Sequence, residues 1–181
     1  MVMPMRVIKG LEGAAFGLVD GVICISGMII GVAIVTSDIR IIFISAITGG
    51  LTDAFGNSIG IYLSGYTERG AQIHSQEQGI ETSVDSTQEI LFSAILSFLV
   101  TVGVVAIMLM PFLFLDIGKS LIFCIIFALI SLSGLGIYVG KLSGEKPINT
   151  SIKFVLIGTV GMVFSYFIGN ILKAVLYNFF T

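Results

Sequence analysis

Residues 8–35 read IKGLEGAAFGLVDGVICISGMIIGVAIV. This run has only three charged residues, Lys9, Glu12 and Asp20, and it exceeds the roughly 20 apolar residues that cross about 30 Å of hydrocarbon. It therefore predicts a transmembrane helix. The run is too long and too charged for a secretory signal peptide, so we expect it to remain as the first span.

The composition of the whole chain agrees with this prediction. The 181 residues are 56% hydrophobic and only 11% charged, whereas soluble domains carry about 25% charged residues. Mean hydropathy is +1.08. We therefore predict an all-α integral membrane protein that forms a single transmembrane domain over residues 1–181. The net charge of −2 gives no indication of a nucleic-acid partner.

Four further apolar runs follow the first, and each is long enough to span a bilayer. The five predicted helices cover about 8–35, 39–66, 89–115, 118–141 and 149–178. Pro111 is expected to kink or end the third helix. The connection 67–88 is the one clearly polar and acidic stretch, so we expect it to lie outside the membrane.

The distribution of basic residues predicts the orientation of the chain, because cytoplasmic loops are enriched in Lys and Arg. With the N-terminus in the cytoplasm, the cytoplasmic basic residues are Arg6, Lys9, Arg69, Lys141, Lys146 and Lys153. The basic residues on the other side are then Arg40, Lys119 and Lys173. We therefore expect a multi-pass protein of the cell membrane with its C-terminus outside and the 67–88 connection in the cytoplasm.

Two acids near the middle of the first two spans, Asp20 and Asp53, are the main candidates for function. A carboxylate at this depth costs roughly 3 kcal/mol, so it needs a partner, a cavity or an ion. Asn57 follows Asp53 by one helical turn. Carboxylate and amide oxygens suit divalent cations such as Mg²⁺, Mn²⁺ and Fe²⁺. A structural role for either acid, as a hydrogen-bond acceptor for another helix, is the alternative.

Other acids could gather cations on the cytoplasmic side. Glu12 lies two turns before Asp20, although it could instead reach water at the membrane interface. The acids Glu77, Glu81, Asp85 and Glu89 recur every four residues and would form one stripe on a helix. A solvated face of a linker helix is the alternative explanation of that stripe.

Small residues also follow a pattern. Gly13, Gly17 and Gly21 repeat every four residues, as do Gly56 and Gly60. This spacing allows close helix contact in lipid, either within one chain or in a dimer through the first two spans. Cys24 and Cys124 lie within apolar runs, where we expect them to act as small hydrophobic residues.

Several segments, taken in order, resemble the vacuolar iron transporter and nodulin-like family. The first span contains FGLVDG at 16–21, similar to the family's FGxxDG, and the second contains GIYLS at 60–64, similar to its GEYLS. The matching small-residue and proline pattern of the third span comprises Ala94, Ser97, Phe98, Gly103 and Pro111. The matching stretch of the fifth comprises Gly158, Ser165, Tyr166, Ile168 and Gly169.

The resemblance implies a homodimer that exports Fe²⁺, and often Mn²⁺, from the cytoplasm in exchange for protons. It also implies a metal site between the first two helices at the dimer interface, with Asp20 as the matching aspartate. The chain departs from the pattern by placing Asn57 at the family's methionine and Ile61 at its glutamate. Asp53 stands one turn earlier, where the family usually has a small residue.

The expected function is therefore proton-coupled export of Fe²⁺ or Mn²⁺, with Asp20, Asp53 and Asn57 as ligands and Glu12, Glu77 and Glu81 as collecting residues. The short 67–88 connection and the oxygen ligands predict a harder site that favours Mn²⁺ or Mg²⁺ as much as Fe²⁺. No catalytic motif is present, so we expect no enzyme activity and no permanently bound cofactor. The alternatives are a membrane scaffold or assembly subunit, and a transporter of another small cation.

Overall fold

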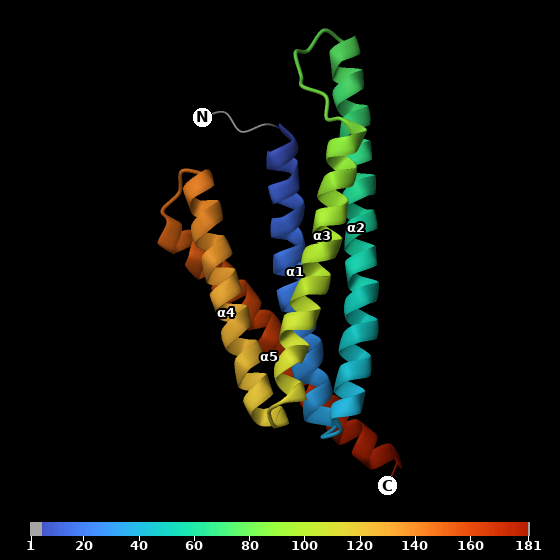
Figure 1. The fold of residues 1–181 in the computed structure, drawn as a ribbon, viewed down its shortest axis with the longest axis vertical. Helices are drawn as coiled ribbons and strands as arrows, with labels where there is room; N and C mark the ends of the chain where they lie inside the picture. The colour runs from blue at the N-terminus through green and yellow to red at the C-terminus, as the bar shows by residue number, and fades with distance from the viewer. Residues whose placement is uncertain (1–4, 181) are drawn as a thin grey trace.

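The computed structural model describes residues 5–180, which form an all-helical bundle without strands in that part of the chain (Figure 1). The elements are α1 (Met5–Val35), α2 (Ile39–Glu77), α3 (Thr87–Leu109), the 3₁₀ helix η1 (Met110–Leu113), α4 (Ile117–Leu142) and α5 (Pro147–Phe180). All five α-helices are long and apolar enough to cross a membrane, which confirms the predicted membrane fold. Pro111 lies in η1 directly after α3, so the predicted end of that helix is also observed.

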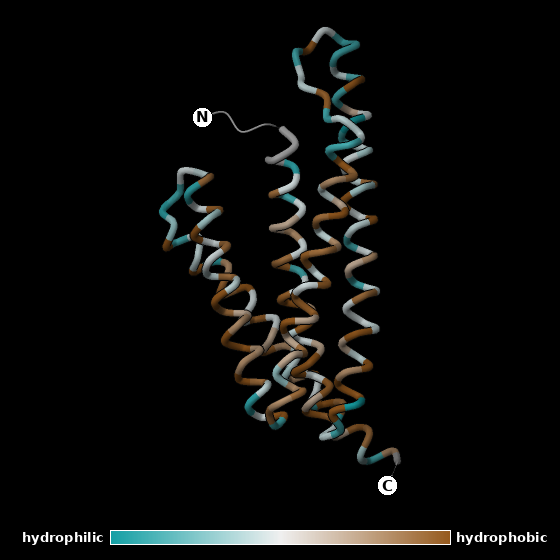
Figure 2. The backbone as a smooth tube through the Cα atoms, in the orientation of Figure 1, coloured by the Kyte–Doolittle hydropathy of each residue, from teal (hydrophilic) through white to brown (hydrophobic). Residues whose placement is uncertain are grey.

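The polar residues gather at the two ends of the bundle and the apolar residues between them (Figure 2). The first end holds the segment between α2 and α3 and the turn between α4 and α5 (Figure 1). The second end holds the α1–α2 and α3–α4 connections, so α1 begins at the first end and α5 finishes at the second (Figure 1). This distribution is what a bilayer around the middle of the bundle requires.

Helix α1 is the central element, because it contacts each of the other four α-helices (Figure 1). Its residues Val22, Ile25 and Ile29 are fully buried and form the middle of the hydrophobic core. Any residue on α1 is therefore positioned by the whole bundle, and this applies to Asp20.

The glycines of α1 bring its backbone into direct contact with α3. A side chain at Gly13 would overlap the backbone of Ser93, and one at Gly17 would overlap that of Ser97. Thr101 of α3 also donates a hydrogen bond to the Gly17 carbonyl at 3.1 Å. The first glycine stripe therefore serves packing within the chain, and the dimer through the first two spans stays a prediction.

The glycines of α2 behave differently. No atom of the described chain lies within 4 Å of the place where a side chain at Gly56 or Gly60 would begin. The surrounding face of α2 is exposed and apolar, and its large residues are Ile44, Leu51, Phe55, Ile59 and Leu63. A dimer interface on α2 therefore remains open to a second copy.

Helix α2 ends at Glu77, about one turn after His74, rather than near residue 66 as predicted. Gly79 then adopts a left-handed conformation with φ of +81°, which ends the helix because glycine tolerates it. As a result the expected helical stripe through Glu77, Glu81, Asp85 and Glu89 does not form. Glu77 ends α2, Glu81 and Asp85 lie in the loop, and Glu89 caps α3 with Ser86.

Asp85 anchors this loop to the rest of the chain. Its side chain is only 4% exposed and forms an ion pair with Lys9 of α1 at 3.0 Å. Gln72 donates to its carboxylate at 3.1 Å and accepts from its backbone N–H at 2.8 Å, while Arg69 donates to its backbone carbonyl. Burial raises the pKa of Asp85, but the hydrogen bonds from Gln72 and Lys9 and the charges of Lys9 and Arg69 outweigh it, so the net pKa is below the ordinary value.

We expect Asp85→Asn to lower the free energy of unfolding at neutral pH by about 2 kcal/mol, because a charged hydrogen-bond acceptor is lost. The lowered pKa fixes the pH dependence: the stabilisation is complete above the unfolded-state pKa near 4 and is lost as the pH falls through the lower folded-state value. Thermal unfolding in detergent should therefore separate the two proteins at pH 7 and show them converging in acid. Glu81→Gln in the same loop is the matched control, and an equal loss in both variants contradicts the assignment.

Candidate metal site

The candidate site lies between α1 and α2, which are antiparallel neighbours joined by the short segment 36–38. Asp20 lies about 17 Å along the helix axis from the start of its span at Lys9, at 1.5 Å per residue. Asp53 lies about 21 Å from the start of α2 at Ile39 by the same measure. Both acids are thus well inside a hydrocarbon layer of about 30 Å.

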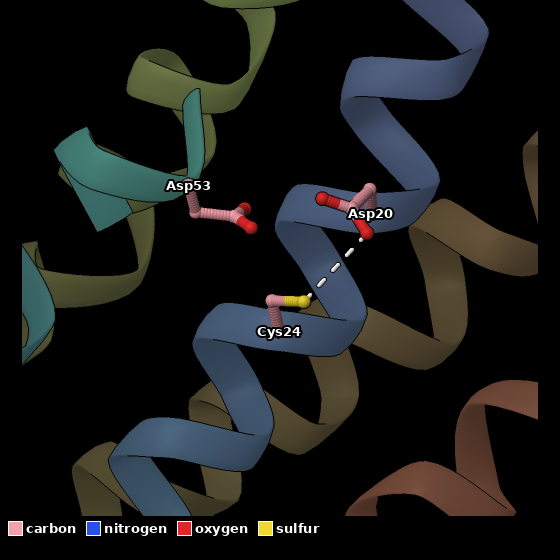
Figure 3. A group of neighbouring side chains, drawn as sticks. All are labelled: Asp20, Cys24 and Asp53. Carbon is pink, nitrogen blue, oxygen red and sulfur yellow. Dashed lines mark hydrogen bonds between the residues drawn. The ribbon is translucent and has the colours of Figure 1, made fainter. Parts of the chain in front are cut away.

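The two predicted acids do meet. Asp53 points from α2 toward α1, where Asp20 and Cys24 lie one turn apart (Figure 3). A carboxylate oxygen of each acid and the Cys24 Sγ lie within 4.8 Å of one another. Three potential metal ligands from two helices therefore surround one point inside the membrane region.

Asn57 also belongs to the cluster, and its amide Nδ2 donates a hydrogen bond to Asp20 Oδ2. From the sequence we expect the carbonyl oxygen of Asn57 as a neutral ligand, whereas in the structure the amide nitrogen faces the carboxylate. Asn57 therefore orients Asp20 in this structure. To serve as a metal ligand, its amide would have to rotate.

Cys24 is the residue that sequence reasoning missed, because it was assigned to packing. Its thiol lies 3.6 Å from Asp20 Oδ1, to which it donates a weak hydrogen bond (Figure 3). The spacing from Asp20 is i, i+4, which places both residues on one helix face. That spacing was the signal that could have identified it.

The charge of the cluster is not balanced by the protein. Among the described residues, no Lys, Arg or His forms an ion pair with Asp20 or Asp53. Asp53 Oδ2 is buried and has no hydrogen-bond donor in the described chain. A buried carboxylate oxygen without a donor is costly, and a cation or a proton would offset that cost.

An open groove of about 590 Å³ leads from the cluster along α1 and α2. Its lining residues are Cys24, Met28, Thr48, Gly49, Thr52 and Asp53. The groove extends toward the end of the bundle where α1 finishes and α2 begins. A small ion in the cluster would therefore not be enclosed by this chain alone.

Glu12 is not part of the cluster. Its carboxylate is 67% exposed and lies 3.7 Å from Lys9, which also approaches Glu68 at 3.6 Å. These residues line a small cleft of about 90 Å³ between α1, α2 and α3 at the end where α1 begins. Glu12 thus lies on the same side of the cluster as the 67–86 segment, and its role as a collecting residue stays a prediction.

The other two predicted residues lie farther out, beyond the bundle. Glu77 is exposed and its carboxylate lies 3.5 Å from His74 Nδ1, and Glu81 is an exposed loop residue. The structure brings neither of them to the cluster of Asp20 and Asp53.

Comparison with known proteins adds independent information about the chain. The family model described as "VIT family" matches residues 67–170, more than half of the chain. The matched segment runs from the polar end of α2 into α5, so it does not include Asp20, Cys24, Asp53 or Asn57. No curated protein matches the chain.

Proposed function

The chain belongs to the VIT family, and from that premise we propose that it carries a divalent metal ion, Fe²⁺ or Mn²⁺, out of the cytoplasm in exchange for protons. The family suggests membrane metal-ion transport in general. The ion, the coupling and the direction are our proposal, and the α1–α2 cluster is the site to which we assign them.

One observation carries the proposal: Asp20 and Asp53 face each other inside the membrane region, without a basic partner in the described chain. Two carboxylates so close in a medium of low polarity repel each other unless a cation or proton lies between them. A divalent ion neutralises both. Acidic residues that face each other within spans commonly mark ion and proton pathways.

The same pair supports coupling to protons. Carboxylates must lose their protons before they bind a metal, so metal binding releases protons and metal release takes them up. Alternation of the two at one site gives an exchange of ion for proton without a second pathway. In this scheme Asp20 and Asp53 are both ligands and proton carriers.

The proposed direction follows from the arrangement of charged residues. Lys9, Arg69 and Lys146 lie at the end of the bundle where α1 begins, which the preference for cytoplasmic Lys and Arg assigns to the cytoplasm. Glu12 and Glu68 line the cleft at that end, and Glu77 and Glu81 lie beyond it. The groove beside Asp53 extends from the cluster in the direction of the opposite end.

We further propose that a second copy closes the groove by packing on α2. Gly56 and Gly60 follow Asp53 at positions i+3 and i+7, so both open glycines lie beside the site on one face of α2. Small residues allow close approach of helices in lipid. The homodimer would thereby shield the two carboxylates from the acyl chains.

Gly60→Leu is therefore expected to convert a dimer into a monomer, because leucine holds the two α2 backbones apart. Size-exclusion chromatography with light scattering in detergent measures this change. Gly134→Leu on α4 is the matched control, since its position is equally open. A wild-type monomer, or a dimer that persists in the Gly60 variant, contradicts the proposed interface.

The experiment that tests the function is metal uptake into proteoliposomes with an acidic lumen. Purified protein should drive Fe²⁺ or Mn²⁺ inward and protons outward, and dissipating the pH gradient with an ionophore should slow the metal flux. Liposomes without protein give the background. Flux equal to that background for both ions overturns the proposal.

A further inference from the structure

Cys24 has surroundings that packing alone does not require. Its thiol faces Asp20 at 3.6 Å and lies within 4.8 Å of a carboxylate oxygen of Asp53. It also lines the open groove beside Asp53. A cysteine that only filled space would be expected to contact apolar atoms instead.

Cys124, the other cysteine of the chain, shows the contrast. It is 0% exposed, belongs to the hydrophobic core and donates a hydrogen bond to the Met108 carbonyl at 3.3 Å. Cys24 is only partly buried and is absent from that core cluster. The two thiols therefore occupy different chemical environments, one structural and one beside carboxylates.

A second sulfur atom follows along the same groove. Met28 lies one turn after Cys24 on α1, and a side chain added at Gly49 of α2 would collide with its terminal methyl group and sulfur. Met28 thus reaches across to α2. The potential metal ligands along the groove therefore begin with the thiol of Cys24 and continue with the thioether of Met28.

The groove also holds two threonine hydroxyl groups, whose protons are used in hydrogen bonds to the backbone of α2. Thr48 donates to the Ile44 carbonyl at 2.6 Å, and Thr52 donates to the Thr48 carbonyl at 2.9 Å. Each hydroxyl proton is thereby occupied, and the oxygen lone pairs remain available to a cation. With Asp53 Oδ2, which has no donor in the described chain, the site combines oxygen and sulfur ligands.

We infer that Cys24 is a specificity-determining ligand of the transported ion, so that the site prefers borderline ions such as Fe²⁺, Co²⁺ and Zn²⁺ over Mn²⁺ and Mg²⁺. This inference rests on the proposed metal transport. Sulfur ligands favour softer ions, whereas sites with only oxygen ligands suit Mg²⁺ and Mn²⁺. It reverses the expectation of a harder site, which was based on Asp20, Asp53 and Asn57 without the thiol.

Binding of the metal by Cys24 releases the thiol proton. The S–H bond of Cys24 breaks, the sulfur keeps the electron pair and forms a bond to the metal, and the proton leaves to water. No electron is transferred, so the oxidation state of the metal is unchanged. Binding of a borderline ion thus adds one released proton to those of the carboxylates.

The direct test is the absorption spectrum of the purified, reduced protein titrated with Co²⁺. Wild type should show a near-ultraviolet sulfur-to-cobalt charge-transfer band, Cys24→Ser should lose it, and Cys124→Ser should keep it. Because the chain has two cysteines, this pair of variants assigns the band to one of them. A band that persists in Cys24→Ser, or is lost in Cys124→Ser, overturns the inference.

Selectivity gives the second readout. The ratio of Zn²⁺ to Mn²⁺ affinity, measured by thermal shift, should fall at least about tenfold in Cys24→Ser, since even residues that only orient a ligand change metal affinity by 10- to 100-fold. Cys24→Asp replaces the sulfur by oxygen and should bind Mn²⁺ while losing preference for Zn²⁺. An unchanged ratio in both variants, with Mn²⁺ binding intact, overturns the role of Cys24 alone. Failure of wild type to bind any of these ions overturns the proposed function as well.

Discussion

Asp20→Asn is expected to lower metal uptake into proteoliposomes at least about a hundredfold. Residues that merely orient a metal ligand already change affinity by 10- to 100-fold, and Asp20 is proposed to be a ligand itself. Asparagine keeps the size of the side chain and its carbonyl oxygen can still accept the hydrogen bond from Asn57. The variant thus removes the charge and keeps the hydrogen bond from Asn57, while the weak hydrogen bond from the Cys24 thiol loses its acceptor.

Stability measurements separate this explanation from a structural role for the acid. If Asp20 serves the bundle as a hydrogen-bond acceptor, its replacement should lower the melting temperature without metal. If it is a metal ligand that faces Asp53, the substitution removes a like-charge repulsion and should leave the melting temperature unchanged or higher. Metal should then no longer raise it, because stabilisation by a ligand follows its affinity for the folded state.

Asp116→Asn is the matched control for Asp20→Asn, since it also removes one carboxylate but is 82% exposed, directly before α4. We expect its uptake to remain within about twofold of wild type at saturating metal, because no ligand of the site is lost. Uptake by Asp20→Asn at the level of this control would exclude the α1–α2 cluster as the transport site.

The second large effect is expected for Gly17→Leu, which should lower the free energy of unfolding by about 3 kcal/mol or more. A Cβ at residue 17 would lie 2.9 Å from Ser97 Cα and closer still to the Ser97 carbonyl oxygen, so two backbones would have to separate. The hydrogen bond from Thr101 to the Gly17 carbonyl would be strained at the same time.

Unfolding in mixed micelles of mild detergent and dodecyl sulfate measures this change. Gly134→Leu is the control, because nothing lies within 4 Å of a side chain at that position of α4. We expect the control to unfold close to wild type, within about 0.5 kcal/mol. Equal destabilisation of the two variants would mean that glycine itself, rather than the α1–α3 contact, is required.

The sequence was sufficient to predict the number of spans because the bilayer imposes a length that apolar runs must meet. It did not predict where α2 ends. Residues 67–77 are polar and lie beyond the membrane, and their helix is held by local hydrogen bonds as a continuation of the preceding helical turns. The stopping point depends on the left-handed Gly79 and on the packing of Asp85 against Lys9, which are tertiary features.

The sequence predicted only part of the candidate site. The cost of burying a carboxylate singles out Asp20 and Asp53, because the sequence places both within long apolar runs. Cysteine carries no such cost, so the i, i+4 spacing of Cys24 from Asp20 points to a ligand only once the structure shows that this face of α1 meets α2. The sequence could not show that Gly13, Gly17 and Gly21 pack against α3, because the same small-residue spacing serves contacts within a chain and between chains.

The length of α2 has a mechanical consequence. Its 39 residues form a rod of about 58 Å, nearly twice the hydrocarbon thickness, and no proline interrupts it. The rod is fastened near its outer end through Gln72 and Asp85 to Lys9 of α1. Asp53 lies part-way along this uninterrupted helix, so the wall of the site that α2 supplies and the segment outside the membrane belong to one continuous element. A displacement of the protruding end relative to α1 would therefore reach Asp53 through the helix itself.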